Sequence, residues 1–342
     1  MRLKLCLIVL LLLACAGVQA YDFQAIADRH IMPAYQQLAA ETAALESAAV
    51  SFCAAPSAND LQELQQRYRS AFLAWQGTQH LRFGPVQYLM REHRFAFWPD
   101  NRGAVGRHLS QLIEDPALLQ ADFDISQKSV AVQGFSAMER LLFGNTVPDA
   151  TRCRVIAAIA VNLHQMADGL YRDWFSSETA FVRTFANPAP DNPLYASSQA
   201  LAGQLLNSLH TELELILTQK LAQPLGSSPA KANGKRAEGW RGSSALPAIE
   251  VNLQACQDLY RLAFASVLAD SAPAAQIEAA FEQALTTLSQ IVLPLSRAVS
   301  DTGQRELIIK LQQQLAQLKQ LIARDLAETL GLSLGFNSLD GD

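Results

Sequence analysis

The sequence predicts an all-α protein made of two up-and-down helical bundles. Alanine, leucine and glutamine dominate the chain, and few stretches alternate apolar and polar residues as half-buried strands do. No Asn-Gly or Asp-Gly pair stands between two β-branched runs, so the usual signal of a β-hairpin is missing. A linker with three prolines, residues 186–195, separates two sets of long predicted helices, and each set suits a bundle.

The first element is a leader rather than part of the fold. Arg2 and Lys4 precede an apolar run, residues 5–18, that is too short to span a bilayer comfortably. This pattern predicts a signal peptide, residues 1–20, cleaved after Ala20. The alternative is a lipoprotein box ending at Cys15, whose lipid would anchor the protein to a membrane as an outer-membrane lipoprotein. Both interpretations predict export to the periplasm, and no later segment is apolar enough to span a membrane.

The charge balance argues against a nucleic-acid partner. Without Arg2 and Lys4 the mature chain has 25 basic and 32 acidic residues, a net charge of −7. Nucleic-acid binding requires a basic face, whereas a soluble periplasmic protein tolerates this balance.

Nine helices are expected to follow the leader. Their ranges are 22–50, 59–80, 103–114, 126–143, 151–175, 195–222, 245–269, 273–293 and 302–330. Ser57 after Pro56 starts the second helix, Asp149 starts the fifth, and Pro294 bends or ends its helix because it lacks an amide donor. The first bundle is residues 21–186 and the second is residues 187–342. The second contains a long Gly/Ser/Lys loop, residues 223–244, which is either mobile or functional.

Three cysteines remain after cleavage. An oxidising compartment permits one disulfide among them, and we predict the pair Cys53–Cys153 because both lie near predicted helix ends. Cys256 lies inside a helix and is expected to be a small buried side chain.

The stretch Val130–Gly144 places a carboxylate where a helix should be apolar. Glu139 falls within the apolar arc, so we expect it to be either paired or functional. The structural alternative is a buried salt bridge to an arginine such as Arg82, Arg91 or Arg102, while Arg140 is expected to face solvent. Gly134 lies in the middle of the predicted helix, where it allows either close packing or the approach of a ligand. Ser136 lacks the Gly-x-Ser-x-Gly turn of a serine hydrolase.

The stretch between residues 81 and 103 is irregular and rich in aromatic and arginine side chains. Two tight-turn signals interrupt it, at Gly84-Pro85 and at Trp98-Pro99-Asp100. So much apolar area must pack down, and the polar groups are then expected to face a crevice or to pair internally. His80 and His93 flank its aromatic residues.

Five segments together resemble the imelysin family, also described as imelysin-like or iron-regulated periplasmic proteins. They are AWQGTQHLRFGP at 74–85, FWPDNRG at 97–103, SVAVQGFSAMERLLFG at 129–144, EGWRGSSALPAIEVNLQACQDLY at 238–260 and GFNSLDGD at 335–342. The family signature Gly-x-His-x-x-Glu corresponds here to Gly134, Ser136 and Glu139. The motif histidine is therefore replaced by serine, a weak metal ligand.

The resemblance implies a ligand cleft between the two bundles and a role in iron acquisition at the cell envelope. The first hypothesis is therefore a binding protein without enzymatic activity. Its partners would be envelope iron-uptake proteins or a small anionic or chelated ligand. The ligand residues expected in the cleft are Gly134, Ser136, Glu139, Arg82, Trp98, Asp100, Trp240 and Arg241. A direct site for iron or another divalent metal is a weaker version, with Glu139 as ligand and His80 or His93 in place of the motif histidine. The other hypotheses are a metallopeptidase, as the family name suggests, and an interaction scaffold of an envelope complex.

Overall fold

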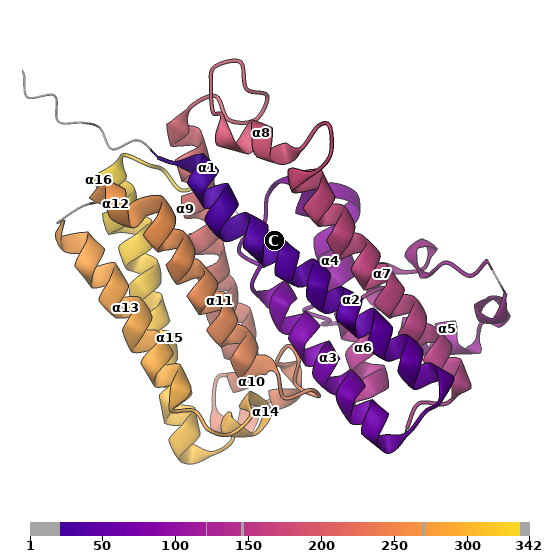
Figure 1. Cartoon of the computed structure of the whole chain (residues 1–342). Helices are drawn as coiled ribbons and strands as arrows, with labels where there is room; N and C mark the ends of the chain where they lie inside the picture. Colours follow the sequence, from indigo (N-terminus) through magenta and orange to yellow (C-terminus); the bar gives the residue numbers. More distant parts are fainter. Residues whose placement is uncertain (1–20, 121, 145–146, 269–270, 336–342) are drawn as a thin grey trace, which may run out of the picture.

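The computed structural model describes residues 21–120, 122–144, 147–268 and 271–335. The secondary structure of these residues consists of helices without a strand, which confirms the predicted all-α class. Two groups of long helices stand side by side in Figure 1. The predicted leader with Cys15, and all but the first residue of the C-terminal segment 335–342, lie outside the described residues.

The first group is built on three long helices. In it α2 packs against both α3 and α7. The helices of this half are α1 (Phe23–Ile26), α2 (Met32–Ala54), α3 (Ala58–Gln76), α4 (Arg91–Phe95), α5 (Ala104–Glu114), α6 (Phe135–Leu142), α7 (Ala150–Phe175) and α8 (Phe181–Ala186). A π-helical turn, Ala27–Ile31, joins α1 to α2.

The second group holds α9, α11, α13 and α15 as its long members. Its helices are α9 (Ser198–Leu215), α10 (Ala222–Leu225), α11 (Ala245–Tyr260), α12 (Ser266–Leu268), α13 (Ala272–Ser289), α14 (Leu295–Ala298), α15 (Thr302–Gln320) and α16 (Ala327–Leu330). Three π-helical turns interrupt the longer predicted helices, at Ile216–Leu221, Arg261–Ala265 and Leu321–Leu326. The face of α11 that meets α3 brings the two groups together.

Side-chain caps explain where several helices begin. Ser57 Oγ accepts a hydrogen bond from the Asp60 amide at the start of α3, and Asp149 Oδ1 accepts from the Arg152 amide at the start of α7. Each cap satisfies an amide that has no partner within its own helix. These two starts were predicted from the sequence, and the structure confirms them.

The predicted helix 126–143 is wrong over its first half. Two 3₁₀ turns, Ile125–Gln127 and Val130–Val132, precede α6, and Gly134 is the residue before its first turn rather than a mid-helix residue. A Cβ on Gly134 would lie 2.1 Å from the carbonyl oxygen of Phe95 and 2.2 Å from that of Arg94. Backbone therefore fills the gap that the missing side chain leaves.

The structure does not contain the predicted disulfide. Cys53, Cys153 and Cys256 are free thiols, although Cys53 Sγ lies 3.4 Å from the carbonyl oxygen of Cys153. The two thiols are thus neighbours at adjoining ends of α2 and α7. Cys256 is fully buried within α11, as expected.

Candidate functional site

A cavity of about 190 Å³ lies between the first half and the long loop of the second. We call this cavity the cleft. Residues 97–101 and α6 form one side, and residues 235–241 form the other. Six of the predicted ligand residues line it: Trp98, Asp100, Ser136, Glu139, Trp240 and Arg241.

Glu139 joins the two halves through the backbone of the loop. Its Oε1 accepts hydrogen bonds from the amides of Arg241 at 2.9 Å and Gly242 at 3.1 Å, and the residue is 6% exposed. Two successive amides that converge on one oxygen form a backbone nest, which suits an anion. Burial raises the pKa of the Glu139 carboxyl, and the two amides and the Arg241 charge offset part of that rise. These amides take the place of the arginine that the structural alternative assigned to Glu139.

None of the three arginines proposed as partners of Glu139 is bonded to it. Arg82 lies 3.8 Å from Glu92, Arg91 forms an ion pair of 2.6 Å with Asp173, and the carbonyl of Arg102 accepts a bond from Arg107. These contacts are internal to the first half.

Two guanidinium groups, those of Arg140 and Arg241, line the cleft. Arg241 lies over the ring of Trp240, 4.3 Å from its centroid. Burial lowers the pKa of Arg241, and the neighbouring Arg140 guanidinium lowers it further. Arg140 was expected to face solvent, but its side chain is only 32% exposed and lines the cleft. Asp100, 3.8 Å from Arg140, and Glu139, whose charge raises the pKa of Arg241, offset part of this positive charge.

The carboxylates that line the cleft already have partners within the protein. Asp100 accepts bonds from the Ala104 and Val105 amides at 2.7 and 3.1 Å, and so caps α5; its Oδ2 also lies 3.8 Å from Arg140. Glu238 forms an ion pair of 2.9 Å with Lys220. Two exposed cations of the lining, Lys235 and Arg236, contact the Trp240 ring and the Gln223 amide respectively, and neither is paired with a carboxylate among the described residues. The cleft therefore favours an anion over a cation.

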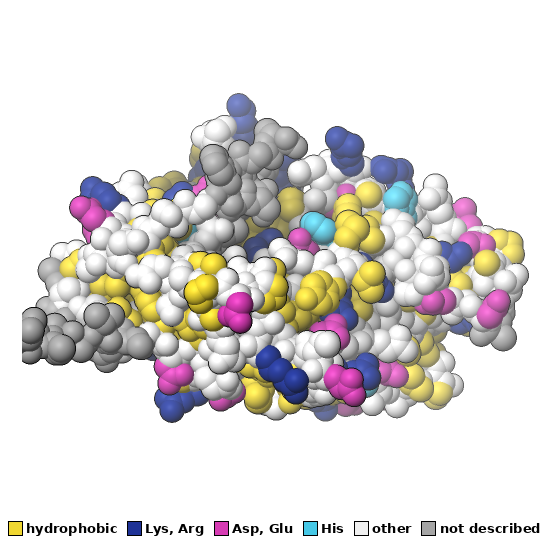
Figure 2. All heavy atoms as spheres, turned by 90° about the horizontal axis from the view of Figure 1, so that it is seen from above, with side chains coloured by type: hydrophobic (Ala, Val, Ile, Leu, Met, Phe, Trp, Pro, Cys, Tyr) yellow, Lys and Arg dark blue, Asp and Glu magenta, His cyan; other side chains and the backbone are white. Residues whose placement is uncertain are grey.

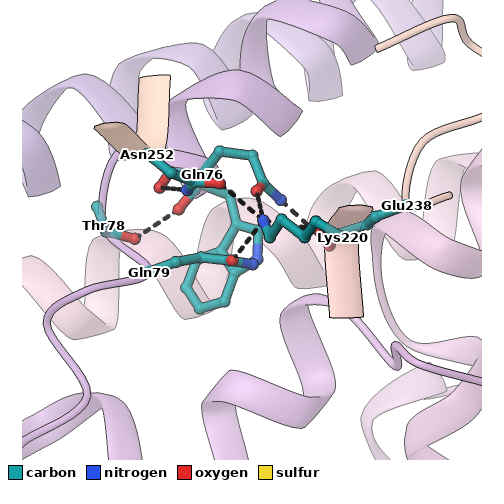
Figure 3. Close-up of polar contacts among 7 residues, drawn as sticks. Gln76, Thr78, Gln79, Lys220, Glu238 and Asn252 are labelled. Atoms are coloured by element: carbon teal, nitrogen blue, oxygen red, sulfur yellow. Dashed lines mark hydrogen bonds and ion pairs between the residues drawn. The ribbon is translucent and has the colours of Figure 1, made fainter. Parts of the chain in front are cut away.

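A buried lysine, Lys220, links Glu238 of the cleft lining to residues of both halves. Lys220, on the π turn Ile216–Leu221, is 2% exposed and donates to Gln79 at 3.0 Å and Asn252 at 2.8 Å, as well as to Gln76. Figure 3 shows these amide oxygens and the Glu238 carboxylate around its amine. Gln76 in turn donates to Glu238 at 3.2 Å. The buried charge is thus fully compensated, as burial requires.

A second, smaller cavity of about 60 Å³ lies on the other side of Trp98 and Glu238. Arg82 and His93 line this cavity and not the cleft. His80 is fully buried elsewhere, with its Nε2 2.6 Å from Nε2 of His30. The structure therefore places Arg82, His80, His93 and Gly134 outside the cleft lining.

The residues around Glu139 do not fit a metal ion. The two backbone donors already occupy one carboxylate oxygen, and Ser136 supplies only a neutral hydroxyl. In the part of the chain that the structure describes, no group of three or more His, Cys, Asp or Glu side chains could hold a metal.

Sequence reasoning missed Arg140, Lys220 and Glu238. Arg140 lies far from the apolar stripe of its helix, and nothing local distinguishes Lys220 from a surface lysine. The signal for Lys235 and Arg236 was present, because the loop 223–244 is both long and basic.

Comparison with known proteins decides the family. A model of the imelysin family matches residues 31–322, which is most of the chain. The chain belongs to the imelysin family. Iron-regulated protein A of Synechococcus elongatus is 25% identical over 218 residues, which cover 62% of this chain and 58% of that protein. The match thus spans little more than half the length of this curated relative.

Two solved structures share the imelysin fold seen here. An imelysin-like protein from Psychrobacter arcticum superposes with a TM-score of 0.78 at 22% identity, over 92% of this chain and 96% of that one. A putative iron-regulated protein A precursor from Parabacteroides distasonis gives a TM-score of 0.73 at 13% identity, over 88% and 93%. At such identities the likeness shows the fold alone.

Proposed function

We propose that this imelysin is an exported, non-enzymatic binding protein of envelope iron acquisition, whose cleft takes a small anionic iron chelate. The observation that carries the proposal is that the Arg140 and Arg241 guanidinium groups both line the cleft, whereas its carboxylates already have partners within the protein. A chelate with several carboxylates would neutralise both guanidinium groups, and arginine binds carboxylates in a bidentate manner. Trp98 and Trp240 offer flat apolar walls beside them.

The periplasmic location and the link to iron come from different sources. The basic, apolar start of the sequence supports export. The name of the Synechococcus relative, Iron-regulated protein A, supports the link to iron. A metallopeptidase stays without a supporting observation, because the described residues offer no cluster of three metal ligands.

Calorimetric titration with ferric citrate and with iron-free citrate tests this function. We expect ferric citrate to bind and its affinity to fall about tenfold or more in Arg241→Gln, as for the loss of a charge-assisted pair. Arg241→Lys should retain part of the affinity, and Glu139 should keep its bonds to the loop, because these come from backbone amides. Arg67→Gln, which removes an exposed arginine on α3, is the matched control. No heat from either titrant, or equal affinities for Arg241→Gln and wild type, would refute the proposal.

A further inference from the structure

One end of the first half carries an exposed apolar tip formed by Tyr88, Leu89 and Met90. Their exposed fractions are 49%, 76% and 54%. Leu89 and Met90 both adopt left-handed backbone conformations, with φ of 54° and 56°. Residues with a Cβ rarely adopt this conformation, and two in succession are rarer still. The backbone thus holds two aliphatic side chains outward at a conformational cost.

The tip stands on a tightly packed base. Phe83 stacks on Phe185 with ring centroids 5.8 Å apart. A Cβ on Gly84 would lie 2.7 Å from the ring of Phe181, so this ring packs directly on the backbone. After the tip, Arg91 donates to the Pro85 carbonyl at 3.0 Å. Both ends of the segment are therefore fixed, and the tip is a built feature of the fold.

A fourth exposed apolar side chain lies at the same end. Leu194 is 60% exposed and adjoins Tyr195, whose ring packs against Phe185 with centroids 6.4 Å apart. Phe181, whose ring packs on Gly84, also packs edge-on against Tyr195 with centroids 6.5 Å apart, which links Leu194 to the base of the tip. Figure 2 looks onto the end of the molecule where α1 and α8 lie and shows hydrophobic side chains gathered across its middle.

The described chain begins at this end. Tyr21 stacks on Phe23 with centroids 5.5 Å apart, and Phe23 packs edge-on against Phe185 at 6.2 Å. Phe185 is therefore shared by the start of the chain and by the base of the tip. The apolar run at residues 5–18 precedes this point, and Cys15 is six residues before Tyr21. Six extended residues reach about 20 Å, so a lipid on Cys15 would hold a bilayer within that distance of this end.

We propose that the apolar tip and Leu194 insert into the surface of a lipid bilayer. Leu89, Met90 and Leu194 would enter the acyl boundary, and Tyr88 would remain at the headgroup level, where tyrosine is favoured. None of the helices among the described residues could span a membrane. The inference is independent of the ligand of the cleft.

Co-sedimentation with vesicles of phosphatidylethanolamine and phosphatidylglycerol tests this contact. The protein is expressed with its own leader in a Cys15→Ser background and collected after cleavage at Ala20, so that neither the leader nor a lipid on residue 15 contributes. The test variant is Leu89→Asn/Met90→Asn, because asparagine accepts the left-handed conformation and preserves the turn. Val292→Asn is the matched control, since Val292 is 78% exposed in the connection between α13 and α14.

We expect the wild type and Val292→Asn to partition equally onto vesicles, and the tip variant to partition at least about tenfold less. The thermal midpoint of the tip variant should be unchanged or higher, which separates lost membrane contact from lost fold. Equal partitioning of the tip variant and the wild type would overturn the inference. A wild-type protein that binds no vesicles would also overturn the inference, and this includes the case in which the tip binds another protein instead.

Discussion

At the scale of single residues, Glu139 shows how a buried carboxylate can be structural and lie at a binding site at once. Its oxygen receives two amides from the opposite half, so the side chain holds the loop that carries Trp240 and Arg241. It also lines the cleft, although its bonding is internal. The two roles are compatible because positioning the loop places Arg241 in the lining of the cleft together with Arg140.

Glu139→Ala tests the structural role. The substitution leaves two amides without their acceptor, and we expect it to lower the free energy of unfolding by about 2–4 kcal/mol. Glu139→Gln keeps an accepting oxygen and should cost less. Urea denaturation measures both, with Glu63→Ala on the exposed face of α3 as the control. A Glu139→Ala protein as stable as the wild type would show that the amides find other partners.

We expect Glu212 to give the protein an unusual dependence of its folding stability on pH. It is fully buried, neither of its oxygens has a hydrogen-bond partner among the described residues, and burial raises its pKa above 4.5 despite the charges of Lys220 and Arg82. The folded state therefore binds this proton before the unfolded state does as pH falls. Its contribution to stability is then lost as pH rises from 4.5 through the folded-state pKa.

Glu212→Gln should remove that loss. We expect the variant to be more stable than the wild type at pH 7.5, on the order of 1 kcal/mol, with the difference vanishing below pH 4.5. Burial lowers the pKa of His30 to about 4, which acts in the opposite direction, so variant and wild type are compared at each pH. Thermal unfolding from pH 4 to pH 8 provides the measurement, with Glu63→Gln as the control. A wild type more stable than the variant at pH 7.5 would mean that the pull of Lys220 outweighs burial.

At the scale of elements, sequence periodicity and caps located the long helices well. The expected helix 151–175 corresponds to α7, Ala150–Phe175, because Asp149 supplies a local cap and the apolar stripe is continuous. The prediction for the stretch before α6 was wrong because the conformation of this stretch depends on residues far away in the sequence. Gln133 Oε1 accepts a hydrogen bond from Arg94 at 2.6 Å, and Asn162 donates one to the Gln133 carbonyl at 2.8 Å. No local pattern in the sequence encodes these contacts.

The same distinction between local patterns and distant contacts explains which residues of the cleft could be predicted from the sequence. Trp98 and Asp100 lie at a turn that the sequence marks clearly, and Glu139 interrupts an apolar arc, so all three could be singled out. Arg82 was selected from the same irregular stretch but lines the smaller cavity, because the path of that stretch is set by packing on α7 and α8. Which arginine faces the cleft is a property of the tertiary fold.

Gly134→Ala tests the packing of this element. The added methyl would collide with the carbonyls of Phe95 and Arg94, which belong to the backbone of α4 and cannot rotate away. We expect a loss of about 3 kcal/mol or more, at the upper end for overpacking. Gly303→Ala is the matched control, since a Cβ added there in α15 would approach only Asp301 Oδ1, at 3.8 Å, and alanine should stabilise by about 0.5–1 kcal/mol. Equal stability of Gly134→Ala and the wild type would require α4 to shift.

At the scale of the whole molecule, two polar clasps hold the halves around the cleft. One is Glu139 with the Arg241 and Gly242 amides, and the other is Lys220 with Gln76 and Gln79. Both clasps connect the first half to parts of the second half that lie close to Glu238: Lys220, which pairs with Glu238, and residues 241–242, which follow it in the chain. Apolar contact between α3 and α11 lies alongside them.

Removing both clasps should uncouple the halves. Lys220→Met alone leaves Glu238 buried without its cation, and we expect a loss of about 3–5 kcal/mol with a single unfolding transition. In Lys220→Met/Glu139→Ala the halves should unfold in two steps, because both clasps are then lost, while Arg69 still donates to the Gly242 carbonyl, Gln76 to Glu238 and Asn252 to the Gln76 carbonyl. Calorimetry distinguishes one transition from two, and Lys319→Met, which breaks a contact between helices of the second half, controls for the loss of a lysine. A single cooperative transition in the double variant would instead assign the coupling to the apolar contact of α3 with α11 and to Tyr21, which packs edge-on against Phe264 of the second half.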